Sequence, residues 1–284
     1  MPLAEGQIQV RDLVMGPGTP YEILSETNPF IRNVRADQSG KRAWGHGSWS
    51  GVEWMDEAVV PLMVLTEGAT TAEWLASHQT LAAAFRPVGE STSDVEMRFC
   101  LGGTEYVMYG RPRTVEPQIR SLIGTIVTKL AFVATDPLIY QGNPVASAPI
   151  HLPTYSGGLT VPMTVPFTVT GVATAGFASV TNVGTVDVGL TLRIDGPVPS
   201  PNVTLKRNDG SIQRLTFDIE LAENEWLDVD TKKRVVLLNG ATSRRGQASG
   251  QWPIVPPGTH ELRWSSPTYN PDATLTPLVR GAWW

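Results

Sequence analysis

Apolar and polar side chains alternate in several parts of the chain, and this alternation predicts β-strands. Between residues 95 and 101, one predicted face is apolar and the other carries glutamate, arginine and cysteine, the apolar members being Val95, Met97, Phe99 and Leu101. Gly102-Gly103 follows, and a second strand-like run extends from Glu105 to Tyr109. Two glycines between such runs supply the positive φ angles of a tight turn, so this region predicts a β-hairpin.

One segment of the first half predicts a helix instead. Thr70 and Glu73 have the spacing of a capping box at a helix start. The residues that share one face of the predicted helix are Trp74, His78, Leu81 and Phe85, with Leu75 and Ala82 beside them. Pro87 ends the helix, because the residue before a proline disfavours helical angles. We interpret His78 as a core or boundary residue, since it lies within this apolar stripe.

The long run Thr125 to Ala134 predicts a further strand, and the second half of the chain predicts strands only. Apolar residues alternate with polar ones from Leu190 to Ile194 and from Leu215 to Leu221. Asn208-Asp209-Gly210 and Asn239-Gly240 are strong turn signals. Short strands at this spacing, without helices between them, predict an antiparallel sandwich.

The residue pattern therefore predicts a mainly β protein with two domains. Residues 1–141 would form an N-terminal β-rich domain with one α-helix, and residues 159–284 would form a C-terminal antiparallel β-sandwich. Residues 142–158 are rich in prolines and small residues and show little periodicity, so we expect them to be a linker.

Composition and charge narrow the classes of function. The chain has 284 residues with 41% hydrophobic and 17% charged residues, a profile typical of a globular protein. The net charge is −5 and no basic run is present, which argues against specific nucleic-acid binding. No apolar run approaches the length of a membrane span, and the first residues do not resemble a signal peptide. We therefore expect that the protein is synthesised in the cytoplasm and does not insert into a membrane.

Candidate chemistry is sparse. Cys100 is the only cysteine, so it predicts a free thiol, and the four histidines lack metal-ligand spacing. No nucleophile elbow, Walker loop or dinucleotide fingerprint is present. We expect no catalytic, cofactor-binding or metal site, no cofactor and no enzymatic activity. The strongest enzymatic alternative is a glycosidase, because four acids surround Trp226, namely Glu223, Glu225, Asp228 and Asp230. A solvated strand face explains these acids equally well.

A series of short motifs follows in a fixed order along the second half. It begins with Asn182-Val183-Gly184-Thr185 and continues with Leu227 to Thr231, Arg234 to Gly240, and Trp252. It ends with Pro256 to Trp264 and the terminal Arg280-Gly281-Ala282-Trp283-Trp284. The order of these motifs resembles that of the phage distal tail protein family, whose members are components of the tail and baseplate hub of siphophages. The N-terminal half is similar too, with one helix in a β-rich domain that closes on a long strand into Asp136-Pro137-Leu138-Ile139-Tyr140.

The resemblance implies a structural role. The N-terminal domain would be β-sandwich-like and would assemble into a hexameric ring, and the C-terminal domain would be a galectin-like β-sandwich. The ring would join the tail tube protein to the tail tip or tail-associated protein, and it would support a receptor-binding protein. The chain would be synthesised in the host bacterial cytoplasm and would then be part of the virion, at the phage tail tip. The alternative is a carbohydrate-binding module or adhesin for host cell-wall saccharides. The sequence lacks both a large carbohydrate-binding insertion and a galectin-type set of His, Asn, Arg and Trp.

Three tryptophans are candidates for the interface between subunits. Trp44, Trp49 and Trp54 are spaced every five residues through a Gly-rich stretch. A regular strand would place successive members on alternate faces, so they cannot all enter one core. We expect at least one of them to lie at the oligomer interface, where large aromatic side chains are enriched. The alternative is that all three are core or boundary residues.

Overall fold

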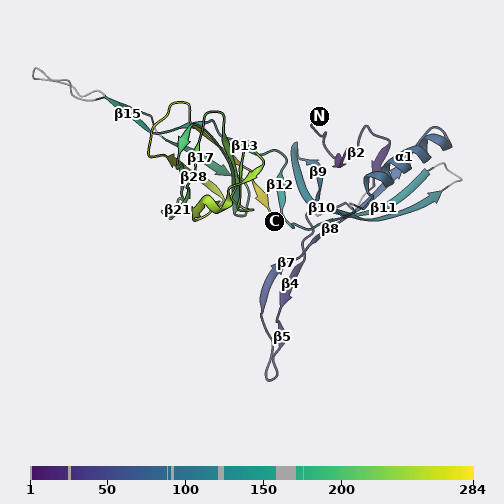
Figure 1. Cartoon of the computed structure of the whole chain (residues 1–284). Coiled ribbons are helices and arrows are strands. Elements are labelled where there is room, and N and C mark those ends of the chain that lie inside the picture. Colours follow the sequence, from purple (N-terminus) through teal and green to yellow (C-terminus); the bar gives the residue numbers. More distant parts are fainter. Residues whose placement is uncertain are drawn as a thin grey trace, which may run out of the picture. The chain divides into compact units, whose positions relative to one another are not determined.

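The computed structural model describes residues 2–24, 27–87, 89–90, 93–120, 125–157, 171–174 and 176–284. The chain divides into two compact units, Met1–Asn143 with Trp284 and Pro144–Trp283, both built from antiparallel strands (Figure 1). This confirms the mainly β fold that the sequence predicts. The first unit contains β1 (Ile8–Val10), β2 (Leu13–Met15), β3 (Tyr21–Ile23), β4 (Val34–Asp37), β5 (Gly40–Lys41), β6 (Ser48–Trp49), β7 (Val52–Met55), β8 (Ala58–Thr66), α1 (Thr71–Ala84), β9 (Val95–Leu101), β10 (Thr104–Arg120), β11 (Thr125–Ala134) and β12 (Ile139–Gln141).

In its described residues, the second unit is built from short strands and one 3₁₀ turn. Its elements are β13 (Val145–Ala146), β14 (Ile150–His151), β15 (Thr154–Gly157), β16 (Gly171–Thr174), β17 (Phe177–Asn182), β18 (Val188–Asp195), β19 (Val198–Pro199), β20 (Asn202–Lys206), β21 (Ile212–Phe217), β22 (Glu220–Leu221), β23 (Trp226–Asp230), β24 (Val235–Leu238), β25 (Thr242–Ser243), η2 (Arg245–Gln247), β26 (Ala248–Gly250), β27 (Ile254–Val255), β28 (Gly258–Ser265), β29 (Thr274–Val279) and β30 (Ala282–Trp283).

The main sheet of the first unit has the strand order β2-β1-β9-β10-β11-β8-β3. Its longest strand, β10, pairs with β9 over its first part and with β11 over its second part, with a register shift between Pro112 and Thr114. The predicted strand Thr125–Ala134 is present with these bounds as β11. Apolar residues from these strands form one core, which includes Val10, Val64, Met97 and Phe132.

The predicted hairpin at Gly102-Gly103 is confirmed. Leu101 pairs with Thr104, and both glycines have positive φ angles, of 61° and 71°, as a tight two-residue hairpin loop requires. Met97 and Phe99 are buried as expected, but the expectation for Leu101 is wrong, because this residue ends β9 at the turn and is 48% exposed.

Cys100 is buried and free, and the N-terminal segment lies beside it. The backbone N–H groups of Gly102 and Gly103 donate to the Glu5 carboxylate at 2.9 and 2.8 Å. The hydrogen bonds from Gly103 and Gly102 hold the pKa of Glu5 below its ordinary value, and burial raises the pKa of the Cys100 thiol. The hairpin loop and the chain start are thereby tied together.

The predicted helix is confirmed as α1, and its capping box is present in a shifted form. The Glu73 backbone N–H donates to Thr70 Oγ1 at 3.3 Å, and the Glu73 carboxylate accepts from the Ala69 N–H at 2.9 Å. Leu81 and Phe85 are fully buried and join the core of the first unit. His78 is half-buried, and its Nδ1 lies 3.3 Å from Thr128 Oγ1, which fits its interpretation as a boundary residue.

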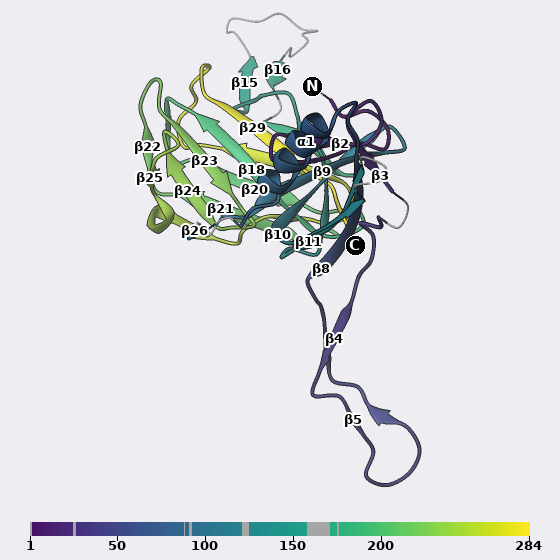
Figure 2. The ribbon, with the colours of Figure 1, turned by 90° about the vertical axis from the view of Figure 1, so that its right-hand side faces the viewer.

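The second unit is a sandwich of two antiparallel sheets. One has the order β13-β29-β18-β23-β24-β25, and the other has the order β17-β28-β20-β21-β26 (Figure 2). Along β18 the side chains alternate between buried and outward-facing, as the pattern from Leu190 to Ile194 predicts. The run from Leu215 to Leu221 is not one strand, because β21 ends at Phe217 and β22 pairs with β19 instead. Trp264 is 2% exposed, and its Nε1 donates to the His151 carbonyl at 3.1 Å.

Parts of the segment expected as a linker, residues 142–158, form paired strands within the second unit. β13 and β14 each pair with β29, and Leu152 between β14 and β15 is fully buried. Hydrogen bonding to β29 fixes this proline-rich stretch, which shows no periodicity because each of these two strands has only two residues. Gly158, at the end of the expected linker, and residues 159–170, at the start of the expected C-terminal domain, lie outside the described residues.

Candidate functional site

An arm formed by residues 33–56 leaves the first unit between β3 and β8. Its base is the pair β4–β7, with Val34 opposite Met55, and its outer part is the pair β5–β6, with Gly40 opposite Trp49. These strands make no ladder with the main sheet, and Figure 2 shows the arm extending past the end of β8. Between Val34 and Met55 no residue is buried in the chain. A two-stranded ribbon without a core is only marginally stable by itself.

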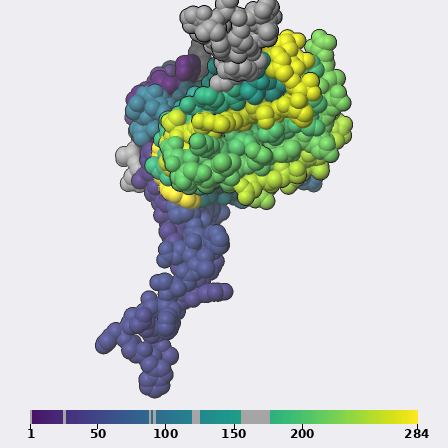
Figure 3. Space-filling view, turned by 90° about the vertical axis from the view of Figure 1, so that its left-hand side faces the viewer, coloured from purple at the N-terminus to yellow at the C-terminus, as the bar shows by residue number. Residues whose placement is uncertain are grey.

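The three candidate interface tryptophans all lie on this arm. Trp44 is in the tip loop and 92% exposed, Trp49 is in β6 and 65% exposed, and Trp54 is in β7 and 56% exposed. They do not share one regular strand, because Ser50 and Gly51 separate β6 from β7. The Arg42 guanidinium lies 5.0 Å from the centroid of the Trp49 ring. The structure thus places the three tryptophans on a solvent-exposed ribbon, and Figure 3 shows this ribbon projecting from the first unit. None of the three lies in a core that the described residues form.

The first unit also contains an apolar groove of about 370 Å³. Phe30 forms one side and is 45% exposed, and its ring meets Phe99 edge-on at 6.1 Å between centroids. Met97 and the exposed Leu101 line it as well. A second hollow shares Gly6 and Ile23 with the groove and is also lined by Glu22 and Glu67. This unit therefore carries both a projecting aromatic ribbon and an apolar groove with acids beside it.

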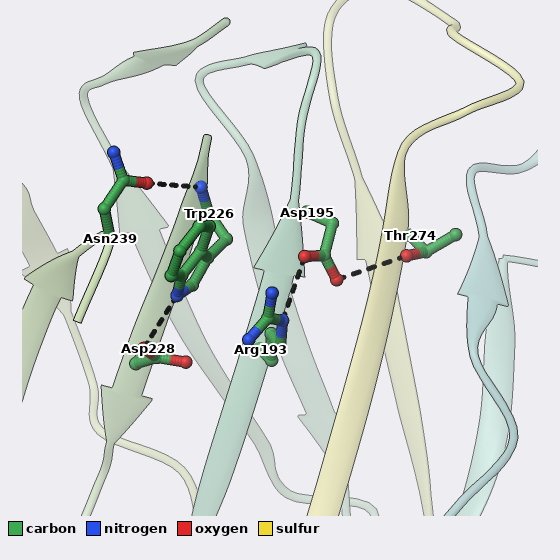
Figure 4. A network of polar contacts seen from close by, with 6 residues as sticks. All are labelled: Arg193, Asp195, Trp226, Asp228, Asn239 and Thr274. Carbon is green, nitrogen blue, oxygen red and sulfur yellow. Dashed lines mark hydrogen bonds and ion pairs between the residues drawn. The ribbon is translucent and has the colours of Figure 1, made fainter. Parts of the chain in front are cut away.

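A different arrangement surrounds Trp226 on the outward face of the larger sheet of the second unit (Figure 4). The indole Nε1 donates to Asp228 Oδ2 at 2.9 Å, and the backbone N–H of Trp226 donates to Asn239 Oδ1 at 3.0 Å. The Arg193 guanidinium lies 4.6 Å from the ring centroid and donates through Nε to Asp195 at 2.9 Å. Thr274 in β29 also donates to Asp195, at 3.5 Å. These six residues form a row across four neighbouring strands or their ends, β24, β23, β18 and β29. Polar partners thus fix the ring in one orientation.

This row borders a polar pocket of about 690 Å³ at the end of the sheet. The pocket is lined by parts of β18 and β23 and by the loops next to them, with Arg193, Asp195, Gly196, Pro197, Glu223, Asn224, Glu225, Trp226, Asn270 and Asp272. Two of the four acids that the sequence groups around Trp226 line it, Glu223 and Glu225. The other two are used elsewhere: Asp228 accepts from Trp226, and Asp230 accepts from the Lys233 N–H at 2.8 Å. The four acids therefore do not form one catalytic group.

Within the described ranges, no group of three or more His, Cys, Asp or Glu side chains is placed to hold a metal ion. In the same part of the chain, no helix has the length and apolar character needed to cross a membrane.

Sequence comparison gives no relative: no protein-family model matches the chain, and neither does any curated protein. Similar folds, in contrast, are found among solved structures. The Dit protein of phage SPP1, described as a paradigm of hub adsorption apparatus in Gram-positive infecting phages, superposes with a TM-score of 0.59 at 15% identity, over 96% of this chain and 98% of its own. Chains of the phage P2 baseplate in its activated conformation superpose with a TM-score of 0.55 at 10% identity. The coverage is 97% of both chains for the structure with Ca and 98% of both for the structure with Sr.

The chain has the fold of a phage Dit protein. The likeness extends through both units, since at least 96% of this chain is covered in each comparison. It confirms the resemblance that the order of motifs in the second half suggests. One of those motifs has a visible structural role, because the buried Asn182 amide donates to the Val186 and Val255 carbonyls at 2.8 and 3.0 Å and so joins three segments of the sandwich.

Several residues of the polar pocket carry no functional signal in the sequence. Arg193 and Asp195 fit the polar positions of a strand, and Asn270 and Asp272 lie in a loop without a motif. Their common feature is proximity to Trp226 through strand pairing, with Asp195 opposite Trp226 on one side and opposite Thr274 on the other. Only the register of β18 between β23 and β29 brings them together.

Proposed function

We propose that this protein is a structural component of a phage tail hub, in which copies of the first unit assemble into a hexameric ring between tail tube and tail tip. The observation that carries the proposal is the exposed, tryptophan-bearing arm on a chain whose whole length has the Dit fold. An exposed ribbon without a core, with three indoles on it, is stable and soluble in an assembly that covers it.

Ring closure needs two different patches on one subunit, so that the first patch of each copy meets the second patch of the next. The arm and the apolar groove of the first unit supply such a pair. The arm tip carries Lys41 and Arg42 next to the indoles, and Glu22 and Glu67 lie beside the groove. Opposite charges around an apolar contact favour one orientation of docking. We infer that the arm of one copy covers the groove region of its neighbour.

The base of the arm offers a further contact. Arg32 Nε and Nη2 are buried and have no hydrogen-bond partner among the described residues, although Nη1 donates to the carbonyls of Pro29 and Ile31. Buried donors of a guanidinium are normally satisfied. An acceptor from an adjoining subunit would satisfy them.

The remaining partners follow from the same proposal. The tail tube protein would contact one side of the ring, and the tail tip or tail-associated protein the other. The second unit would be the support for a receptor-binding protein. This role is mechanical and needs no catalysis, and it places the protein in the virion.

Light scattering on a sizing column, with negative-stain images of the eluted peak, tests the assembly. We expect a hexamer with a central hole for the unaltered chain. Replacing Trp44, Trp49 and Trp54 together by Ala is expected to shift the peak to monomer, because each tryptophan buried at the centre of an interface commonly contributes about 2 kcal/mol or more.

Trp252→Ala is the matched control, since it removes the same side chain from a site in the second unit where the Arg245 guanidinium lies 4.5 Å from the ring centroid. This control should remain a hexamer. Three single arm variants that all form intact hexamers would contradict the role of the arm. An unaltered chain that stays monomeric even with its tube and tip partners would contradict the ring.

A further inference from the structure

The polar pocket of the second unit is the strongest candidate for a ligand site outside the proposed ring interface. Its volume of about 690 Å³ lies within the range of pockets that hold small ligands. Its walls come from loops and the ends of β18 and β23, all within one unit. The proposed ring leaves this pocket without a role.

Hydrogen bonds hold the loops around the pocket in place. The Gly196 N–H donates to the Glu225 carbonyl at 2.8 Å, and the Ala222 N–H donates to Glu225 Oε2 at 2.9 Å. A Cβ at position 196 would lie 2.4 Å from the Ala222 carbonyl oxygen, so only glycine allows this close approach. On the other side, the Asp272 N–H donates to Asn270 Oδ1 at 2.9 Å. The cavity is therefore formed before any ligand arrives.

The groups that remain available are mostly hydrogen-bond acceptors. The Glu223 and Asp272 carboxylates have no hydrogen-bond partner among the described residues, and both residues are exposed. Four carboxylates and one guanidinium line the pocket, which gives it a net negative charge. The two terminal nitrogens of Arg193 donate no hydrogen bond in the described part of the chain, and they lie close to the Trp226 ring. Carboxylates placed this way accept hydrogen bonds from hydroxyl or ammonium groups.

Trp226 adds an apolar surface to this acceptor-rich wall. The ring lines the pocket, and its orientation is fixed by Arg193 and Asp228. An ordered indole beside several polar groups matches a ligand with both an apolar face and many donors. A sugar ring has this character, because its C–H groups form an apolar face and its hydroxyls point outward. Metal ions do not fit, since the carboxylates of the described residues form no group placed to hold one.

We propose that this pocket binds a saccharide without acidic groups, with Trp226 contacting the sugar ring and with Glu223 and Asp272 accepting from its hydroxyl or amino groups. The negative charge of the pocket favours an amine-bearing sugar and disfavours one with carboxylates or phosphates. This set differs from the galectin-type set of His, Asn, Arg and Trp that the sequence lacks.

Isothermal titration of the full chain with three trisaccharides tests the proposal. The probes are a glucosamine trisaccharide, its N-acetylated form and trigalacturonate, all at about pH 6, where the carboxylates are ionised. We expect the first two to bind, with the amine-bearing form about tenfold tighter, and trigalacturonate to give no heat. Glu223→Gln and Asp272→Asn keep the shape of each side chain, and each is expected to weaken binding of the glucosamine trisaccharide by about tenfold.

Asp187→Asn is the matched control, because Asp187 is exposed in the same unit, outside the pocket, and its substitution changes the charge equally. It should leave the affinity unchanged. Equal binding of trigalacturonate, unaltered binding by both pocket variants, or the absence of binding by all three sugars at millimolar concentration would each overturn the proposal. The outcome does not depend on whether the chain forms a ring.

Discussion

The arm of the first unit and the sandwich of the second unit place tryptophans in opposite surroundings. On the arm, Trp44, Trp49 and Trp54 are more than half exposed on a ribbon with no core. In the second unit, Trp264 is buried with its N–H bonded to a carbonyl, and Trp226 is half-buried between Arg193 and Asp228. An indole that its own chain leaves uncovered points to contact with another protein chain, whereas an indole held by polar partners next to a pocket points to a small ligand.

The strongest test of this comparison is to replace one tryptophan of each kind by Ala and measure the free energy of unfolding. Trp264→Ala should reduce the free energy of unfolding of the second unit by about 3–5 kcal/mol, because it leaves a large cavity and an unpaired His151 carbonyl. Trp49→Ala should change the free energy of unfolding of the first unit by less than about 0.5 kcal/mol, since the side chain is exposed in the monomer. Urea unfolding of both variants at concentrations that keep the chain monomeric gives the two values. A large loss for Trp49→Ala would show that the arm is packed in the free chain.

A smaller effect is expected at Trp226. Trp226→Ala removes the contact with Arg193 and the hydrogen bond to Asp228, and should cost the second unit about 1–2 kcal/mol. Trp226→Phe keeps a ring beside the guanidinium but loses the indole N–H, so about half of that cost should remain. Thermal unfolding of both variants beside the unaltered chain measures the difference. Equal stability of all three proteins would mean that the row on this sheet contributes nothing to folding.

The smallest expected effect is a pH dependence of stability that is confined to the first unit. Burial lowers the pKa of His78 in the first unit, so the folded state favours the neutral ring more than the unfolded state does. The stability that depends on this neutral ring is present above the unfolded pKa of about 6.5 and is lost as pH falls through the folded pKa. The first unit should therefore weaken below about pH 6.5, and His78→Asn should remove this part of the pH dependence.

Hydrogen exchange of the β11 and α1 amides between about pH 7 and pH 5, after correction for the intrinsic rate, measures this effect. Amides of the second unit in the same sample serve as the reference, because His78 lies in the other unit. An unchanged pH dependence in His78→Asn would contradict the assignment to this histidine.

Local signals in the sequence predict local structure well. The capping residues of α1, the two glycines between β9 and β10 and the alternation along β18 each act over a few neighbouring residues, and each is present. Prediction from local patterns fails at strand ends, and it fails where a short strand depends on pairing with a strand far away in the sequence. Leu101 follows the alternation of β9 but is exposed at its end, and the strands within residues 145–151 exist because β29 pairs with them.

The candidate sites are predictable to different degrees for the same reason. The spacing of the three arm tryptophans marks them as unusual, but the composition of a Gly-rich stretch does not distinguish a core strand from an exposed ribbon. The pocket depends on strand register over long separations, since Arg193, Trp226 and Asp272 come from three distant parts of the sequence. No pattern within a short window contains that information.

The arm is inserted at a point where the fold tolerates change. The chain leaves the sheet after β3 and returns at β8, and these two strands pair directly, with Ile23 opposite Val64. Everything between them can lengthen, shorten or change in composition without altering the register of any strand pair in the main sheet. Natural variation in this insert can therefore follow changes in a binding partner while the fold that carries it stays constant, and laboratory insertions can use the same position.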